Sequence, residues 1–186
     1  MDKDVSAGSG ITTVIGRLAL GITLLAFGLG HTALIDGVSA SDAASIAQYV
    51  GGVALFVTGL VALREGDAAG GTAFTVLGAL WFTWAVTEVA SGNEAGLFLL
   101  LFALVALSLT VAGGDQLGQG VYGLFFVSLV LLAIAAFAEI GGLAKVGGWF
   151  AVAAGAVAWY AATAALAHWP TALPRRAAGR GVTATG

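Results

Sequence analysis

Four threonines recur along one apolar stretch of this chain and could line a path for a small polar solute. They are Thr72, Thr75, Thr83 and Thr87. On a helix that turns 100° per residue, all four fall within about a third of the circumference. Because a threonine hydroxyl can donate to a carboxylate or to a bound water, this face suits a small carboxylate. The alternative is that each hydroxyl bonds to the carbonyl four residues back in its own helix, which is common for threonine in apolar helices.

Weaker candidates for the same path lie in a later apolar stretch, where Ser128 and Tyr122 carry hydroxyl groups. Tryptophans such as Trp81 and Trp84 are better explained as interfacial anchors or as packing within a bundle than as ligand contacts. The sequence therefore predicts a path lined by threonine and serine hydroxyls.

Few ionisable groups lie near the apolar stretches. His31, Glu88 and Glu139 are predicted near helix ends on the outer side, where a charge costs much less than the roughly 2.5–3.5 kcal/mol at the bilayer centre. Three further carboxylates are predicted on the same side: Asp36, Asp42 and Glu94. Five carboxylates against one lysine give this outer mouth a net charge of about −4, which repels a free anion and concentrates protons. We therefore expect the permeant species to be a protonated acid, or an anion accompanied by a proton.

The sequence offers no constellation for covalent chemistry. Cysteine is absent, and the two histidines, His31 and His168, lack the spacing of metal ligands. The net charge is −3, and no basic cluster of the kind that binds nucleic acid is present. We predict that the chain is not an enzyme, needs no metal or cofactor, and has no nucleic-acid partner.

The composition predicts that a lipid bilayer surrounds these residues. Of 186 residues, 59% are hydrophobic and only 9% are charged, against about 25% charged in soluble domains. Apolar runs of about 20 residues recur, and each could cross a hydrocarbon core of about 30 Å. These runs lack the alternation of barrel strands, and helices satisfy their own backbone in lipid. The prediction is an all-α fold, a single six-helix membrane domain over residues 1–186.

Polar turns divide the chain into six predicted transmembrane helices. Their approximate ranges are 14–34, 45–63, 70–90, 96–112, 119–139 and 145–168. With the N-terminus inside, only Lys145 among the basic residues lies on the outer side. The positive-inside rule thus places both short tails, 1–13 and 170–186, in the cytoplasm of a cell with an inner membrane. Arg17 is expected to extend its charge to the membrane surface. A cleaved signal peptide at the first apolar run is the competing interpretation, but two aspartates precede that run.

Glycines recur seven residues apart within these spans. The pairs are Gly21 and Gly28, Gly52 and Gly59, Gly71 and Gly78, and Gly148 and Gly155. Seven residues are nearly two helical turns, so each pair lies on one helix face and allows close helix approach. The pattern predicts either general packing of a glycine-rich bundle or a set of tight helix pairs.

An ordered set of motifs resembles the acetate uptake transporter family, also called the succinate–acetate permeases. The first set, in the second and third predicted helices, is Gly51-Gly52-x-Ala54, Gly59-Leu60, a charged turn with Gly66, Thr72-Ala73-Phe74-Thr75, Gly78 and Trp81-x-Thr83. The second set is Phe125-Phe126, Ile140-x-Gly142, Gly147-Gly148-Trp149, Gly155-Ala156 and Tyr160. The resemblance covers roughly residues 16 to 168.

This resemblance implies six helices around a central path, a homo-oligomeric ring that is typically a hexamer, and movement of acetate, succinate or similar carboxylates, often with protons. It places the family's apolar constriction on Leu20, Leu77 and Ser128. The chain departs from the family where Leu55 and Ala62 replace a glutamine and a glutamate. Before the first helix, only Gly16 remains of the usual Asn-Pro-Ala-Pro-Leu-Gly signature.

We therefore predict a membrane permease or channel for small monocarboxylates such as acetate, with the lipid bilayer and further copies of the chain as its partners. Two alternatives belong to other classes. One is a non-transporting scaffold or accessory subunit that keeps the fold, which the leucines at positions 20, 55 and 77 favour. The other is a passive channel for small neutral solutes.

Overall fold

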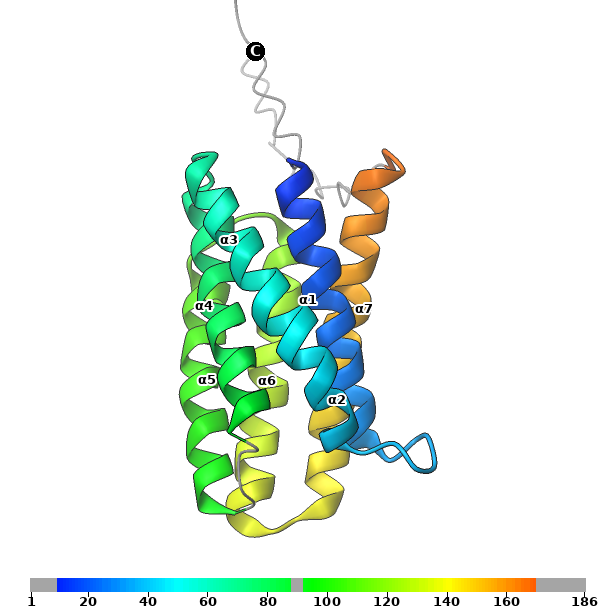
Figure 1. The fold of residues 1–186 in the computed structure, drawn as a ribbon. Helices are drawn as coiled ribbons and strands as arrows, with labels where there is room; N and C mark the ends of the chain where they lie inside the picture. The colour runs from blue at the N-terminus through cyan, green and yellow to red at the C-terminus, as the bar shows by residue number, and fades with distance from the viewer. Residues whose placement is uncertain (1–9, 88–91, 170–186) are drawn as a thin grey trace, which may run out of the picture.

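Six long helices form one bundle in the computed structural model, which describes residues 10–87 and 92–169 (Figure 1). In chain order the elements are α1 (Ile11–Thr32), α2 (Ala40–Ile46), η1 (Ala47–Ala54), α3 (Leu55–Arg64), α4 (Ala68–Val86), α5 (Asn93–Val111), α6 (Gln116–Ala138) and α7 (Gly141–Leu166). The segments α2, η1 and α3 are continuous and form the second span, Ala40–Arg64. Six helices are thus long and apolar enough to cross a membrane. The all-α, six-helix prediction is confirmed for the described residues.

Helix caps explain why several spans begin earlier than the sequence suggested. The second span begins at Ala40 rather than 45, because Ser39 and Asp42 form a capping box in which the Ser39 backbone N–H donates to Asp42 at 2.7 Å. Similarly, Asp67 accepts from the Gly70 N–H at 2.9 Å and starts α4. These aspartates satisfy backbone donors that a helix start leaves free, so they belong to the helices rather than to open loops.

The middle of the second span is a π-helix, η1, over Ala47–Ala54. Such wide turns are rare in proteins and frequently occur at functional sites. Gly51 lies in this segment, where a Cβ would come within 2.5 Å of the Thr23 methyl carbon. The π-helix therefore packs closely on α1 through a residue without a side chain.

The glycine pairs form two tight helix crossings. A Cβ on Gly28 would lie 2.6 Å from the Val152 backbone nitrogen, and one on Gly155 would lie 2.7 Å from the Leu25 nitrogen, so α1 and α7 touch backbone to backbone. The hairpin of the second span and α4 is closed in the same way by its own four glycines: Gly52, Gly59, Gly71 and Gly78. Of the two interpretations of the glycine pattern, tight helix pairs are what the structure shows.

The helices surround a core of large side chains. Neighbours pack in the order α5, α6, α7, α1, second span, α4 (Figure 1). Between α4 and α5, the side chains of Trp81 and Phe102 lie with their rings 5.3 Å apart. The start of α1 and the end of α7 lie at the same end of the bundle (Figure 1).

Candidate functional site

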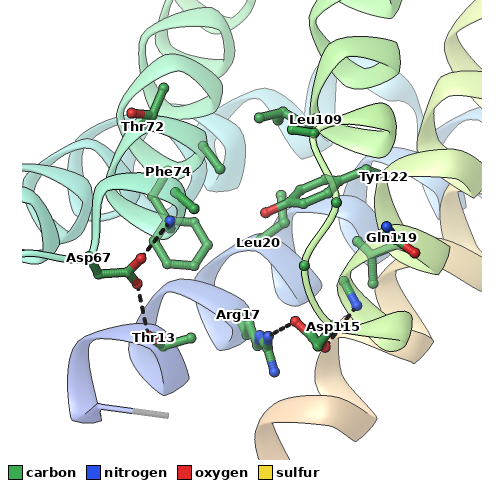
Figure 2. Close-up of a pocket in the computed structure, with 18 of the residues that line it drawn as sticks. Thr13, Arg17, Leu20, Asp67, Thr72, Phe74, Leu109, Asp115, Gln119 and Tyr122 are labelled. Carbon is green, nitrogen blue, oxygen red and sulfur yellow. Dashed lines mark hydrogen bonds and ion pairs between the residues drawn. The ribbon is translucent and has the colours of Figure 1, made fainter. Parts of the chain in front are cut away.

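A cavity of about 560 Å³ opens at the end of the bundle that holds the start of α1. We call it the Arg17 cavity. Its polar lining comes from α1, α4, α6 and the turns before α4 and α6: Thr13, Arg17, Asp67, Thr72, Asp115, Gln119 and Tyr122. Leu20 and Phe74 are among the apolar residues that line it. Figure 2 shows the Tyr122 hydroxyl pointing into this space toward Leu20. The volume is typical of small-molecule sites.

An ion pair crosses this cavity. The Arg17 Nη2 atom lies 2.5 Å from Asp115 Oδ1, and Asp115 also accepts from the Gly118 N–H at 3.0 Å as the N-cap of α6 (Figure 2). The turn before Asp115 contains Gly113 and Gly114, both with positive φ, which turn the chain back toward α1. Arg17, which we expect to extend its charge to the membrane surface, has a 22% exposed side chain that pairs with this carboxylate at the cavity.

Two further hydrogen bonds join α1 to the turn before α4. The Thr12 hydroxyl donates to Glu65 Oε2 at 2.5 Å, and the Thr13 hydroxyl donates to Asp67 Oδ2 at 3.4 Å. These bonds and the Arg17–Asp115 pair tie the start of α1 to the turns before α4 and α6. A small anion entering this cavity meets one guanidinium, which could bind a carboxylate in place of Asp115.

A second cavity of about 580 Å³ opens at the opposite end. We call it the His31 cavity. It is lined by small and polar side chains with two larger apolar ones: His31, Ala40, Ser41, Ala44, Ser45, Gln48, Trp84, Ala85, Ala95 and Leu99. The His31 Nδ1–H donates to the Phe27 carbonyl at 2.8 Å, because a carbonyl can only accept. This bond leaves Nε2 as the ring nitrogen that is free to accept.

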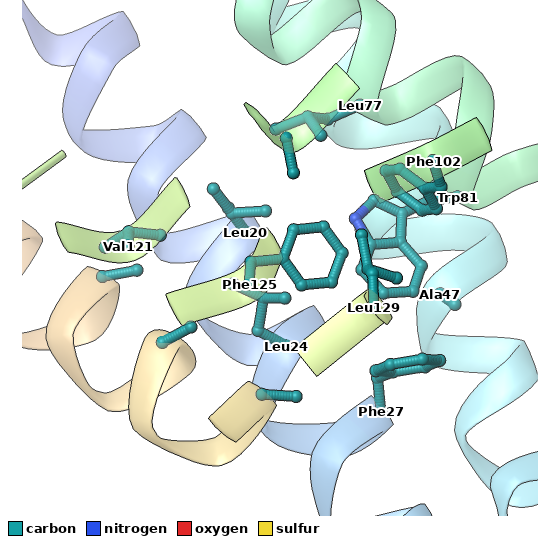
Figure 3. Packing of buried hydrophobic residues seen from close by; sticks show 14 of the residues in the cluster. Leu20, Leu24, Phe27, Ala47, Leu77, Trp81, Phe102, Val121, Phe125 and Leu129 are labelled. Carbon is teal, nitrogen blue, oxygen red and sulfur yellow. The ribbon is translucent and has the colours of Figure 1, made fainter. Parts of the chain in front are cut away.

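An apolar plug separates the two cavities. It consists of eight buried side chains: Leu20, Leu24, Phe27, Leu77, Trp81, Phe102, Phe125 and Leu129. Leu20 at one side also lines the Arg17 cavity, and Phe27 at the other contacts His31, with ring centroids 4.4 Å apart. Each of the eight is at most 2% exposed, so these side chains fill the space between the two cavities. Figure 3 shows Phe125 between Leu20 and Trp81, with Leu77 above it.

The structure separates the predicted threonines. Thr72 lines the Arg17 cavity, and in Figure 2 its hydroxyl points away from Tyr122. Thr75 lies at the crossing with Gly59, where its buried Oγ1 has no hydrogen-bond partner among the described residues. Thr83 and Thr87 are exposed on the outside of the single chain, and the Thr83 hydroxyl donates to the Ala79 carbonyl at 2.9 Å. The Thr87 hydroxyl likewise donates to the Thr83 carbonyl at 2.7 Å, so back-bonding describes both Thr83 and Thr87. Thr72 alone of the four lines a cavity among the described residues.

The predicted constriction residues are all buried. Leu20 and Leu77 belong to the apolar plug, whereas the Ser128 hydroxyl donates to the Gly147 carbonyl on α7 at 2.8 Å. The sequence reasoning left Phe125 and Trp81 out of the constriction. Only the tertiary structure shows that these two residues belong to the apolar plug, where their rings stack with centroids 5.5 Å apart.

The predicted outer-mouth residues lie in different places. His31 lines the cavity at that end, as described above. Glu139 is exposed at the C-cap of α6 with a φ of 56°. Glu88 lies outside the described residues. The sequence reasoning missed the polar residues of the His31 cavity, which include Ser41, Ser45 and Gln48. It placed Ser41 before the helix, which begins at Ala40 in the structure, and it did not show that Ser45 and Gln48 face a cavity.

Known proteins resemble this chain along most of its length. The Succinate-acetate/proton symporter SatP of Escherichia coli is 29% identical over 163 residues, covering 80% of this chain and 84% of that protein. The Glyoxylate pathway regulator of Yarrowia lipolytica is 28% identical over 170 residues and 83% of this chain, and this alignment spans 63% of the Yarrowia protein.

A solved structure, that of the bacterial acetate channel SatP, matches the fold with a TM-score of 0.78 at 23% sequence identity. The match covers 84% of this chain and 92% of that one. The sequence model of the GPR1/FUN34/yaaH family matches residues 9–172. The resemblance noted from the motifs is thereby confirmed. This chain is a multi-pass membrane protein, and it belongs to the GPR1/FUN34/yaaH family.

Proposed function

We propose that this chain is a permease or channel for small monocarboxylates of the size of acetate. The observation that carries the proposal is the arrangement of two cavities at opposite ends of the bundle, separated by one apolar plug. Alternating or gated access needs such a closed level between two openings. The relatives named as a succinate-acetate/proton symporter and as an acetate channel supply the substrate class.

The contents of the cavities fit a small carboxylate. The Arg17 cavity is lined by one guanidinium, the Tyr122 hydroxyl, the carboxylates of Asp67 and Asp115, and apolar side chains such as Leu20 and Phe74. A monocarboxylate has one charged end and a short apolar tail, so it fits this site if it replaces Asp115 as the partner of Arg17 while its tail contacts the apolar residues. Thr72 and Ser128 remain proposed path residues, with Leu20 and Leu77 as the constriction.

The chain is proposed to act in the inner cell membrane, with both termini cytoplasmic, as a ring-shaped homo-oligomer that the family resemblance suggests is a hexamer. The Arg17 cavity would then face the cytoplasm, and the His31 cavity the outside. Proton coupling is proposed from the carboxylates predicted at the outer mouth.

Labelled-acetate uptake into proteoliposomes, with and without an imposed proton gradient, tests this function. Concentrative uptake driven by the gradient supports a proton-coupled permease, and flux that ignores the gradient supports a channel. Labelled ethylammonium, a cation of similar size, serves as the control solute. Absence of acetate flux above that of empty liposomes in both conditions would contradict the proposal. That result would favour a non-transporting scaffold.

A further inference from the structure

The centre of the apolar plug contains one hydrogen-bond donor without a partner. Trp81 is fully buried, and its Nε1 atom makes no hydrogen bond to any described residue. Buried polar groups are nearly always paired, because an unpaired one forfeits the hydrogen bonds it had in water. An unpaired indole N–H at the level that closes the path therefore calls for an explanation.

The Trp81 ring is held in a fixed orientation by four aromatic neighbours. It stacks on Phe125 at 5.5 Å with an interplanar angle of 21°, and it meets Phe27, Trp84 and Phe102 edge to face at 5.0, 5.9 and 5.3 Å. Such contacts fix both χ angles of the side chain. The direction of the N–H is thus set by packing rather than by a polar partner, which is the condition for a preorganised donor.

The N–H is directed along the proposed path. Figure 3 shows the indole nitrogen at the ring edge that points toward the space between Leu77 and Phe125. Leu77 and Phe125 belong to the level between the cavities, and Leu20 beside them lines the Arg17 cavity. On the other side, Trp84 touches Trp81 and lines the His31 cavity. A solute passing between the cavities therefore passes this donor.

The surroundings of the donor select the chemical form of the solute. The buried cluster around the donor is hydrophobic, and the fully buried hydroxyls of Thr23 and Ser128 already donate to the Ala19 and Gly147 carbonyls. One neutral N–H among hydrocarbon cannot replace the water shell of a carboxylate, so an ionised carboxylate is strongly disfavoured there. A neutral carboxylic acid loses much less solvation free energy there, because its carbonyl oxygen can accept from one donor while its alkyl tail contacts the leucines.

We propose that the Trp81 Nε1–H donates a hydrogen bond to the carbonyl oxygen of a small protonated carboxylic acid as it crosses the apolar plug. Trp81 is then a substrate-binding residue of the closed level. This inference rests on the proposed function for its substrate class, and it adds the form in which the acid crosses. A dicarboxylic acid brings a second carboxyl group to a level with one donor, so succinate should cross more slowly than acetate.

Indole N–H resonances test this contact without any transport measurement. The chain has five tryptophans, and ¹⁵N-tryptophan labelling of the intact protein in lipid nanodiscs gives one indole signal for each. Single Trp→Phe variants at the other four positions assign the Trp81 signal by elimination, so no Trp81 variant needs to fold. Acetate is added at about pH 5 and about pH 8, since model carboxyl groups titrate near pH 4.

The expected result is a saturable shift of the Trp81 indole signal with acetate, larger at about pH 5 than at about pH 8. The signal of Trp159, whose side chain is 48% exposed, should not move in the same titration. A Trp81 signal that does not move, or that moves equally with sodium chloride at the same pH, would overturn the proposal.

Transport by Trp81→Phe gives the second test, since phenylalanine keeps an aromatic ring and removes the N–H. The loss of one hydrogen bond should lower acetate uptake about tenfold, while Trp159→Phe keeps the parental rate. If the parent transports acetate and folded Trp81→Phe keeps its full rate, the Trp81 inference fails while the proposed function stands. If the parent transports no acetate, the proposed function fails, and the indole titration still decides whether Trp81 binds the acid.

Discussion

Arg17 of α1 and Asp115, the N-cap of α6, form an ion pair across the Arg17 cavity, with 2.5 Å between Nη2 and Oδ1. Their side chains are 22% and 51% exposed, so solvent screens the pair and its contribution to stability is about 0–1 kcal/mol. A pair that contributes so little to folding can still matter for binding, because an incoming carboxylate competes with Asp115 for the same guanidinium.

This competition predicts opposite effects for the two partners. Arg17→Gln removes the cation and should raise the KM for acetate about fivefold, which corresponds to roughly 1 kcal/mol. Asp115→Asn frees the cation while asparagine still caps α6, so it should lower KM by a similar factor. Initial uptake rates against acetate concentration measure both. If both variants raise KM together, the pair acts only as a structural contact.

The close crossing of α1 and α7 predicts that a large side chain at the crossing prevents the protein from folding, whereas the same side chain elsewhere does not. A Cβ on Gly155 would lie 2.7 Å from the Leu25 nitrogen and 2.9 Å from the Gly21 carbonyl oxygen, and backbone atoms cannot move aside. Gly155→Leu should therefore yield little folded protein. Gly120→Leu is the matched control, because a Cβ there meets no atom within 4 Å. Yield and monodispersity in detergent measure both. Normal assembly of Gly155→Leu would contradict the packing argument.

Helix periodicity gave the right spans and the right glycine faces because both depend on local spacing. The wheel that groups Thr72, Thr75 and Thr83 gives their angles relative to one another, but not which way the face turns in the bundle. That direction is decided by the crossing at Gly59, which turns Thr75 toward the second span and leaves Thr83 outside.

The site was less predictable than the fold because it depends on contacts between distant residues. Nothing near Arg17 in the sequence indicates a partner 98 residues away. Tryptophan is the residue type typical of an interfacial anchor. Only the contacts of Trp81 with four aromatic neighbours, from α1, α4, α5 and α6, show that it lies at the centre of the apolar plug. The helix starts at Ala40 and Ala68 depend on the capping bonds of Asp42 and Asp67, which the hydrophobic pattern alone does not reveal.

The position of Leu20 at the edge of the apolar plug predicts that its side chain limits the flux of acetate. Leu20 lines the Arg17 cavity and is 2% exposed, so Leu20→Ala should widen the closed level and raise acetate uptake severalfold. Leu132→Ala is the control, since it removes the same atoms from a 3% exposed core position beside Gly147. Each truncation costs about 2–5 kcal/mol of stability. Equal uptake by the two variants, measured per folded protein, would contradict a gating role for Leu20.

The positions of Thr72 and Thr83 on α4 predict that the same substitution, threonine to valine, affects acetate uptake differently at the two positions. Thr72 lines the Arg17 cavity, and rotation about its χ1 can turn its hydroxyl toward a bound solute. Thr72→Val should therefore lower acetate uptake about two- to threefold, the effect of losing one weak hydrogen bond. Thr83→Val removes a hydroxyl that bonds to Ala79 on the outer face, and should leave uptake unchanged. Loss of uptake in Thr83→Val alone would place the path on the outer face of the chain, between neighbouring subunits.

The acidic outer mouth predicts a small shift in the pH dependence of uptake. Glu139 is exposed at the end of α6, and a carboxylate there raises the proton concentration near the opening. One charge at about 10 Å in water changes the local potential by about 0.4 kcal/mol, or about 0.3 pH unit. Glu139→Gln should therefore move the external pH of half-maximal uptake by intact cells about 0.3 unit toward acid. Glu88→Gln is predicted to act in the same direction.

Salt and position provide the controls for this electrostatic effect. At about 1 M salt the Debye length falls to about 3 Å, so the shift should disappear. Glu65 lies at the opposite end of the bundle, where it accepts from Thr12, and Glu65→Gln should leave the external pH profile unchanged. An unchanged profile in both Glu139→Gln and Glu88→Gln would exclude the acidic mouth as the source of protons. A shift that persists at high salt would instead indicate that a glutamate itself carries the proton along the path, since direct transfer does not depend on the long-range field.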